Sequence, residues 1–260
     1  YGVIVADTKE YLNRKNFYEK FLTVYGKNPV LEALKNPDII FHKIHIAQTK
    51  KITDFNKTII KVAEERGIDV ITHTRKSLSR ISKNINQDQG IAADLYFDNH
   101  HLFPDFIKSM PKNNFTLIAL DGITNPQNLG MIIRSVTASP CYGILLPNKG
   151  NAALSPLVIK ASAGTLFKST LIKCNSLEEA IPRLRDKGII TCALSGAGET
   201  SINEFKIESP VVYVLGNETT GVSKSVRNLC THQIKIPMSS GVESLNVSVV
   251  AALLAFNTCF

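Results

Sequence analysis

Six apolar runs between Phe115 and Pro237 restrict the fold of this chain more than any other feature. They read FTLIALDG, YGILLP, STLIKC, GIITCAL, PVVYVLG and HQIKIP, with helical segments between them. Near-continuous apolar runs of this length are typical of parallel strands buried on both faces of a sheet. The sequence therefore predicts an α/β domain with a parallel sheet.

The last apolar segment, LNVSVVAALLAF, has the length of a helix and almost no polar face. A helix that is apolar all round is buried in a protein core. We therefore expect the chain to end inside its own core, which is unusual.

The first part of the chain alternates helix and strand patterns from Gly26 onward, which predicts a small α/β domain. A chain of 260 residues is long enough for two separate cores. The expected organisation is an N-terminal extension without periodicity (1–20), the small α/β domain (21–97), a linker with two prolines (98–113) and the larger domain (114–260).

The chain carries 30 Lys and Arg against 22 Asp and Glu, a formal net charge of +8. This surplus favours polyanionic partners such as nucleic acid, although a soluble protein of lysine-rich composition would look the same. No segment reaches about 18 consecutive apolar residues, and the N-terminus lacks a basic flank followed by a long apolar run. We therefore expect a cytoplasmic protein that does not span a membrane.

The five cysteines are scattered and include no C-x-x-C pair, which predicts reduced, mostly buried thiols. His42 and His45 fall in an alternating stretch, and His100 and His101 fall in the predicted linker. Neither group has the spacing of a metal site, so no metal is expected.

The segment DGITNPQNLGMIIRSV predicts a helix with a well-specified start. Asn125 is a suitable N-cap, and Pro126 occupies the first helical position. Arg134 would lie over the bare backbone of Gly130 on the face opposite the apolar stripe, which leaves room for a ligand beside the guanidinium. An ordinary solvated arginine is the alternative.

The segment VVYVLGNETTGVSKSV runs from a buried strand into a loop between two glycines. Gly216 and Gly221 have the spacing of a phosphate-binding loop, but Val222 stands where the phosphate-binding lysine is needed. A nucleoside triphosphate site is therefore rejected. A glycine turn that lets the backbone approach a small ligand stays open.

The segment IKIPMSSGVESLNVSVVAALLAF leads from a strand into the terminal helix. Ser244 is a plausible N-cap of that helix. Asn246 places a polar amide at the start of an apolar helix, where it must find hydrogen-bond partners in the structure or in a ligand. No G-x-S-x-G elbow is present, so serine hydrolase chemistry is disfavoured.

In this order and spacing, the three segments resemble the motifs of the SpoU (TrmH-like) family of RNA ribose 2′-O-methyltransferases in the SPOUT superfamily. NPQNLGMIIRS resembles the first motif, VLGNETTGVS the second and IPMSSGVESLNVSVVAALLAF the third, over roughly residues 114–260. VYGKNPVLEAL and DQGIAA are similar to the small substrate-binding domain of the subgroup that includes bacterial 23S rRNA guanosine methyltransferases.

The resemblance implies that the C-terminal segment threads a loop of the catalytic domain and forms a deep trefoil knot, an arrangement otherwise almost absent from proteins. It implies that S-adenosylmethionine is held in a bent shape, mostly by backbone groups, with contacts at Gly216, Ile236, Met238 and Leu245. The catalytic positions of the family fall on Asn128, Arg134, Glu218, Ser244 and Asn246.

The implied reaction is attack of a ribose 2′-OH on the sulfonium methyl group, with removal of one proton. Arg134 falls on the position that is proposed for this family as the base, or as the group that orients the base. Because a guanidinium keeps its proton at neutral pH, an RNA phosphate held by Arg134 is the alternative proton acceptor.

The resemblance also implies a homodimer whose RNA contact spans both subunits. The expected substrate is structured RNA, with a guanosine of 23S ribosomal RNA first and a transfer RNA second. A catalytically silent RNA-binding protein would be expected to have lost Arg134 or the trio 244–246, which are present. A dinucleotide-dependent oxidoreductase needs a complete glycine fingerprint, which the sequence lacks.

Overall fold

A computed structural model describes residues 21–37, 39–49, 53–82, 88–97, 100–205 and 209–257. The chain divides into two compact units, Tyr1–Asp98 and Asn99–Phe260, which are treated separately below. The predicted N-terminal extension, residues 1–20, lies outside the described residues.

The first unit is built on a four-stranded sheet with the order β1-β4-β2-β3. Strand β4 is antiparallel to β1 and β2, and β3 is parallel to β2. The C-terminal ends of β1, β2 and β3 therefore meet the start of β4 at one end of the sheet. The elements are β1 (Phe21–Tyr25), α2 (Lys27–Lys35), β2 (Phe41–Ala47), α3 (Asp54–Glu65), β3 (Asp69–His73), α4 (Arg75–Ser82) and β4 (Ile91–Tyr96).

Strand β1 lies before Gly26, where no element was predicted. Val24 is its one fully buried residue, and the other four are half-buried, so the strand carries little apolar pattern. Its place in the sheet comes from pairing with β4, in which Val24 lies opposite Ala93. Backbone pairing with a remote strand leaves no periodic signal in the local sequence.

A chain of polar side chains crosses all four strands of the small sheet. Thr23 Oγ1 donates to Asp94 Oδ1 (2.6 Å), Asp94 Oδ2 lies 3.1 Å from His45 Nε2, and His45 Nδ1 lies 2.9 Å from His73 Nε2. Because His45 Nε2 faces a carboxylate, it donates to Asp94, and His45 Nδ1 then accepts from His73. We call these four residues the sheet ladder.

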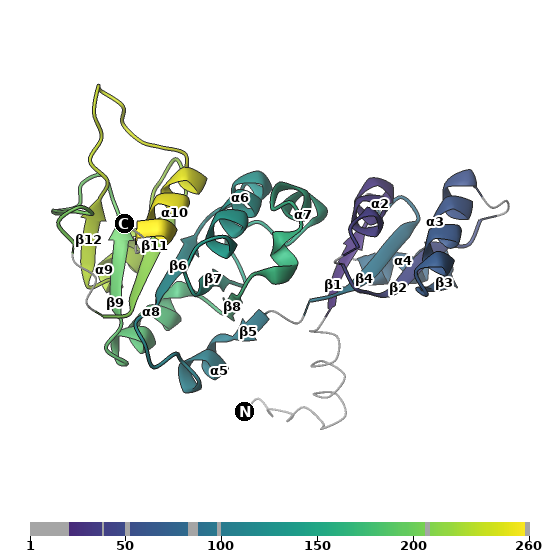
Figure 1. Ribbon diagram of the computed structural model, residues 1–260, viewed down its shortest axis with the longest axis horizontal. Coiled ribbons are helices and arrows are strands. Elements are labelled where there is room, and N and C mark those ends of the chain that lie inside the picture. Colours follow the sequence, from purple (N-terminus) through teal and green to yellow (C-terminus); the bar gives the residue numbers. More distant parts are fainter. Residues whose placement is uncertain are drawn as a thin grey trace, which may run out of the picture. The chain divides into compact units, whose positions relative to one another are not determined.

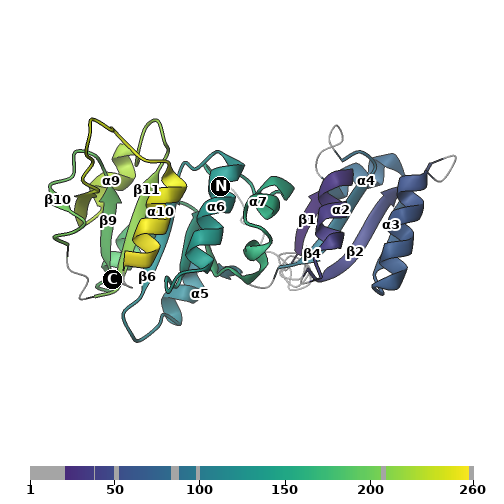
Figure 2. The ribbon, with the colours of Figure 1, turned by 45° about the horizontal axis from the view of Figure 1, so that its top comes forward.

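The second unit is an eight-stranded sheet with the order β10-β12-β9-β11-β6-β7-β8-β5, in which every neighbouring pair is parallel (Figures 1 and 2). The prediction of a parallel sheet is thus confirmed. Its strands are β5 (His100–Leu102), β6 (Thr116–Asp121), β7 (Gly143–Pro147), β8 (Leu171–Cys174), β9 (Ile190–Leu194), β10 (Thr200–Ser201), β11 (Val211–Gly216) and β12 (His232–Lys235).

Short helices connect these strands, and residues on both faces of the central strands β6 and β11 are buried. The helices are α5 (Phe103–Lys108), α6 (Pro126–Thr137), α7 (Pro156–Ala161), α8 (Leu177–Arg185), α9 (Lys224–Leu229) and α10 (Val247–Phe256), with one 3₁₀ turn, Thr165–Lys168. Burial on both faces explains why these strands read as continuous apolar runs.

The prediction of a linker over residues 98–113 is wrong for residues 100–108. Residues 100–108 form β5 and α5 in the second unit, and β5 is the edge strand of the sheet and pairs with β8. Phe103 and Phe106 of α5 are buried in the core, and Pro104 lies in the first turn of that helix. Two buried residues in a six-residue helix are too few for a periodic signal, and a proline suits a helix start as well as a linker.

The terminal helix α10 packs against α6, β6 and β11, as Figure 2 shows. Ala251, Leu254 and Ala255 are buried, but Val249 is 44% exposed and Leu253 is 49% exposed. The prediction that this helix is entirely buried is therefore right for one face and wrong for the other.

The described thiols of Cys141, Cys174, Cys192 and Cys230 are free. Burial raises the pKa of Cys141, Cys174 and Cys192 to about 12 and that of Cys230 to about 11. Cys259 lies outside the described residues.

In the described ranges, no three His, Cys, Asp or Glu side chains are grouped so that they could hold a metal ion. No helix in these ranges is long and apolar enough to cross a bilayer.

Candidate active site

The three sequence motifs meet at one edge of the large sheet. Strands β6, β11 and β12 are parallel, so the segments that follow them leave from the same edge. In open α/β sheets, ligands bind at this carboxyl edge of the strands. The opposite edge carries none of the predicted site residues.

Helix α6 begins as predicted, directly after β6. Asn125 is the N-cap, and its side chain accepts from the backbone N–H of Gln127 (2.8 Å). Pro126 occupies the first helical turn, where its missing N–H costs nothing. Asn128 follows in the first turn and is 8% exposed, so its amide needs partners inside the protein.

Hydrogen bonds tie the loop after β6 to the loop after β11. Asp121 and Gly216 lie opposite each other as the last paired residues of the two strands. Asp121 Oδ2 accepts from the backbone N–H of Ser223 (2.7 Å), and Asn217 Nδ2 donates to Gly122 O (3.0 Å). These contacts bring the first and second motifs together although about a hundred residues separate them.

Gly216 is required by the protein's own backbone. A Cβ at this position would lie 2.0 Å from Gly221 C and from Val222 N, because the loop closes on itself and Gly221 N–H donates to Asn217 O (2.8 Å). The sequence predicts a glycine turn that a ligand approaches. The structure supplies an intramolecular reason for the same glycine.

Three of the five predicted catalytic residues form one hydrogen-bonded chain. Asn128 Nδ2 donates to the Glu218 carboxylate, and Asn128 Oδ1 accepts from Asn246 Nδ2 (3.2 Å). Asn246 Oδ1 in turn accepts from the backbone N–H of Ser248 (2.9 Å) and from its hydroxyl (2.6 Å). We call Asn128, Glu218 and Asn246 the amide chain, and it contains one residue from each motif.

The N-cap of α10 is Asn246 and not Ser244, which corrects the sequence prediction. Asn246 accepts the N–H of Ser248 with its Oδ1, whereas its Nδ2 donates to Asn128 in the amide chain. Ser244 lies two residues earlier, exposed on the loop before the helix. Both residue types are good N-caps, so the local sequence does not choose between them.

Arg134 lies on α6, exposed and outside the amide chain. At 1.5 Å per residue, its Cα is about 9 Å along the helix axis from that of Asn128. The predicted space beside Arg134 is wrong, because a Cβ on Gly130 would lie 2.5 Å from Ala161 Cβ and 2.8 Å from Val158 O. Helix α7 fills the gap that Gly130 leaves.

The other predicted cofactor contacts lie on the loop between β12 and α10, residues 236–246. Ile236 is half-buried, Met238 is 37% exposed and Leu245 is 39% exposed. Figure 1 shows this loop projecting beyond the strands that precede it. The structure therefore places Ile236, Met238, Leu245 and Gly216 at the same edge of the sheet, with Gly216 packed and the loop side chains accessible.

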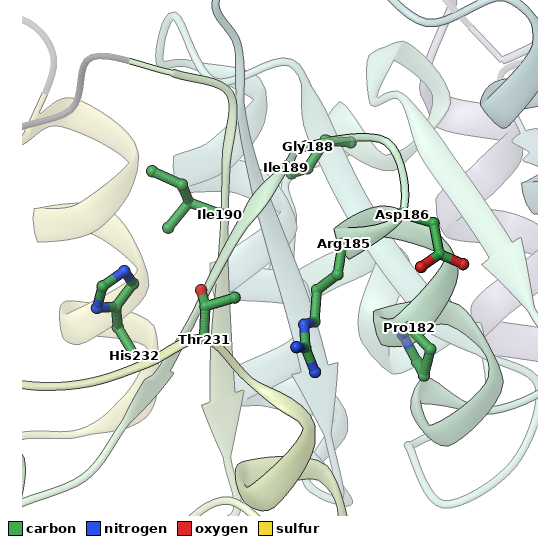
Figure 3. A pocket seen from close by; sticks show the side chains of 8 residues that line it. All are labelled: Pro182, Arg185, Asp186, Gly188, Ile189, Ile190, Thr231 and His232. Atoms are coloured by element: carbon green, nitrogen blue, oxygen red, sulfur yellow. The ribbon is translucent and has the colours of Figure 1, made fainter.

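A separate cavity of about 500 Å³ lies on the opposite edge (Figure 3). Ile190 and His232, the first residues of β9 and β12, line it. Arg185 extends toward the strand side of this cavity and donates to Leu229 O (3.0 Å), whereas Asp186 points away. No predicted site residue lines this cavity, so it does not belong to the candidate active site.

Sequence reasoning missed Asn151, which holds the β6 loop from a distance. Its Oδ1 accepts from the backbone N–H of Ile123 (2.7 Å), and its Nδ2 donates to Leu120 O (3.1 Å). The residue lies in an irregular segment after β7, where Asn and Gly are ordinary loop residues. No local signal separates a clamp of this kind from a turn residue.

Comparison with known proteins adds two family matches. Residues 114–256 match the model of the SpoU rRNA Methylase family, and residues 23–97 match the model described as RNA 2′-O ribose methyltransferase substrate binding. A protein of Mycolicibacterium vanbaalenii, named an uncharacterized tRNA/rRNA methyltransferase, is 31% identical over 234 residues, 89% of this chain and 74% of that protein.

Solved structures share the fold. The SpoU methyltransferase AviRb from Streptomyces viridochromogenes, solved with AdoMet, aligns with a TM-score of 0.60 and 20% identity over 96% of this chain and 91% of its own. An AdoMet-bound rRNA methyltransferase from Sinorhizobium meliloti aligns with a TM-score of 0.60 and 21% identity over 95% and 88%. Together with three motifs joined at one sheet edge, these matches establish that the chain belongs to the SpoU family of RNA methylases.

Proposed function

We propose that this protein transfers a methyl group from S-adenosylmethionine to a ribose 2′-OH in structured RNA. The observation that carries the proposal is the amide chain, which joins one residue of each motif at the carboxyl edge of the sheet. The substrate that we favour is a guanosine of 23S ribosomal RNA, because VYGKNPVLEAL and DQGIAA resemble the small domain of the subgroup that includes 23S rRNA guanosine methyltransferases. A transfer RNA is the second candidate, since relatives carry the name tRNA/rRNA methyltransferase.

The residues at this edge fit S-adenosylmethionine. Met238 and Leu245 present apolar side chains to solvent, and large exposed apolar groups beside a polar cluster suit a ligand with an adenine ring and charged groups. Gly216, Ile236, Met238 and Leu245 would hold it, and two solved structures of the same fold contain AdoMet. When bound, this cofactor supplies a methyl group made electrophilic by a sulfonium.

The amide chain would set the geometry of the site before substrate arrives. The Glu218 carboxylate holds the Asn128 amide, and Asn128 holds Asn246 at the start of α10. Fixed side chains of this kind lose little entropy when substrate binds, which favours an aligned attack. Ser244, two residues before Asn246, would contact the cofactor or the ribose from the loop.

Arg134 would place an RNA phosphate next to the reacting ribose. A guanidinium keeps its proton at neutral pH, so it serves better as a phosphate anchor than as a base. The phosphate would then accept the proton of the 2′-OH. Arg134 is exposed, as a residue that meets RNA must be.

We infer that the C-terminal segment threads the catalytic domain as a trefoil knot. Strand β12 is separated from β6 by β9 and β11, yet α10 contacts α6, β6 and β11. The chain therefore crosses two strands between β12 and α10. A crossing of this kind is the path that a knot requires, and an experimental structure with an unthreaded C-terminus would contradict the inference.

We infer that two copies associate through α6 and α10. These helices pack against each other, and Met131, Val249 and Leu253 on them are 43%, 44% and 49% exposed. Such apolar surface is typical of an interface. Leu253→Glu is expected to convert a dimer to a monomer in light scattering, whereas a wild-type monomer would contradict the inference.

The test of the function is incubation with methyl-labelled S-adenosylmethionine and total RNA, followed by mass spectrometry of the labelled nucleosides. A 2′-O-methylguanosine in 23S rRNA supports the favoured substrate, and a labelled tRNA supports the second. RNA that is retained by the protein but stays unlabelled would instead identify a silent RNA-binding protein. Arg134→Ala serves as the control that separates enzymatic from chemical methylation.

A further inference from the structure

Two sequence segments of the small domain converge at one end of its sheet, although more than fifty residues separate them. Gly26 N–H donates to Ile91 O (3.0 Å), and Lys27 N–H donates to the Gln89 side chain (3.0 Å). Gly26 has φ 93 and Gly90 has φ 83, a region that favours glycine. These contacts join the segments VYGKNPVLEAL and DQGIAA, to which the chemistry of the large domain assigns no role.

Arg75 is anchored at this end of the sheet by a buried carboxylate. Asp88 is fully buried, pairs with Arg75 Nη1 and also accepts from Ser82 Oγ (2.9 Å) and Gly90 N–H (2.9 Å). The Arg75 side chain is 46% exposed. A buried carboxylate is tolerated when it is fully paired, and here it holds a guanidinium at the surface in a defined orientation.

A cavity of about 370 Å³ adjoins this guanidinium and is lined by Gln48, Thr49, Thr74 and Arg75. Its volume falls within the range of about 300–1,000 Å³ found for small-ligand sites. The lining provides the Arg75 guanidinium and the Gln48 amide, groups that donate to phosphate oxygens and read the edge of a base. The Thr74 hydroxyl already donates to Ser77 Oγ (3.0 Å).

The charge at this end of the sheet suits a polyanion. Lys27, Arg75 and Lys76 are exposed, whereas the Asp88 carboxylate is buried and paired with Arg75. Arg is the residue that best matches phosphate geometry, and sequence-specific RNA recognition mostly targets unpaired nucleotides.

From this we propose that the end of the small sheet formed by Lys27, Gln48, Thr49 and Arg75 binds an unpaired nucleotide of the RNA, with its phosphate on Arg75 and its base in the adjoining cavity. The proposal rests on the proposed RNA-modifying function and adds to it the surface that captures the substrate. It assigns the buried Asp88 a positioning role, because Asp88 acts through Arg75.

The test measures binding of the full chain to a fluorescein-labelled pool of stem-loop RNAs with a randomised loop. The double variant Gln48→Ala with Thr49→Ala is expected to weaken binding about tenfold, because it removes polar groups from the cavity. Arg75→Lys is expected to weaken binding by a similar factor. A lysine keeps the charge and the pairing with Asp88 but loses the planar fork of the guanidinium. Arg80→Lys is the matched control, since Arg80 is an exposed arginine on the same helix. It is expected to change binding less than twofold.

Equal weakening by Arg80→Lys, or wild-type binding by the Gln48 and Thr49 variant, would overturn the proposal. Circular dichroism melting of each variant shows whether the fold is kept, and Gln48→Ala with Thr49→Ala removes no contact to Asp88. Methyl transfer measured on the same samples separates the two claims. A wild type that binds the pool without methylating RNA defeats the proposed function alone, and variants that bind and methylate like wild type defeat this inference alone.

Discussion

The amide chain of the large unit and the sheet ladder of the small unit are both hydrogen-bonded chains of polar side chains, but they are held in different ways. The ladder crosses strands, and Thr23 and Asp94 lie directly opposite each other in the register of β1 and β4. The amide chain lies where strands have ended and joins residues from two loops and a helix start. Strand pairing therefore holds the first, whereas only side chains hold the second, at an edge where ligands can reach them.

The two chains also differ in their chemistry. Amides do not titrate, so the Asn128–Asn246 part of the amide chain keeps its donors and acceptors at every physiological pH. The ladder contains His73 and Asp94, which change charge between acid and neutral pH and whose pKa values are both lowered in the folded protein. The comparison teaches that paired amides at strand ends keep their hydrogen bonds whatever the pH, whereas a titratable chain within the sheet makes stability depend on pH.

The largest expected effect is that of Arg134→Ala on methyl transfer. Loss of the phosphate anchor should lower kcat by about 10²–10⁴-fold, the range typical of lost proton-transfer catalysis. S-adenosylmethionine affinity in calorimetry should stay within about threefold, because Arg134 lies outside the amide chain. Lys160→Ala, an exposed cation on α7, is the control. Near-normal turnover of the Arg134 variant would remove Arg134 from the mechanism.

Asn246→Ala should act on stability as well as on the cofactor. The change leaves Asn128 Oδ1 without its donor and α10 without its N-cap, which costs about 1–3 kcal/mol of unfolding free energy. Ser244→Ala is the matched control, because Ser244 is exposed and caps nothing, and it should cost less than about 0.5 kcal/mol. Equal losses in urea unfolding would contradict the assignment of the N-cap to Asn246.

Acid should destabilise the small unit before the large one. Burial, together with the charge of His45, lowers the pKa of His73 below 6.5 in the folded protein. As the pH drops below 6.5, His73 of the unfolded chain is therefore protonated before His73 of the folded chain. The free energy of unfolding falls with pH for this reason. Burial raises the pKa of Asp94, but hydrogen bonds from His45 and Thr23 outweigh it and lower the pKa below 3.8. Its stabilising effect is therefore present above 3.8 and lost at lower pH.

Hydrogen exchange at pH 7 and pH 5, corrected for intrinsic rates, measures this difference. Peptides from β2 and β4 should lose protection at pH 5, while peptides from β6 and β11 keep theirs. His73→Gln should reduce the pH dependence of the small unit. Equal losses in both units, or an unchanged pH dependence in the variant, would contradict a role for the ladder.

The smallest effect concerns the buried thiols of the large unit. Because burial raises the pKa of Cys174 and Cys192 to about 12, only about one molecule in 10⁴ carries either thiolate at pH 8. Iodoacetamide should therefore label these two cysteines only after unfolding, as peptide mass spectrometry would show. Rapid labelling of the native protein would contradict the burial of these thiols in a closed core.

Prediction from sequence succeeded where the signal is carried by neighbouring residues. The continuous apolar runs predicted the parallel sheet, and Asn125 with Pro126 predicted the start of α6. Prediction failed where a segment remote in the sequence determines the surroundings of a residue. The sequence pattern predicts free space for a ligand beside Gly130, but α7 fills this space. It predicts a linker at residues 100–108, but these residues pair with β8 and pack in the core.

By itself, the sequence determined that this chain forms two α/β units and that three polar motifs follow buried strands, because apolar patterning and helix capping act over a few residues. Tertiary structure alone decided that Asn246, and not Ser244, caps α10 and bonds to Asn128 from 118 residues away. It also decided that Val249 and Leu253 stay exposed on a helix whose other face is buried. The physical reason is that such contacts depend on the path of the chain between remote segments, which no local pattern encodes.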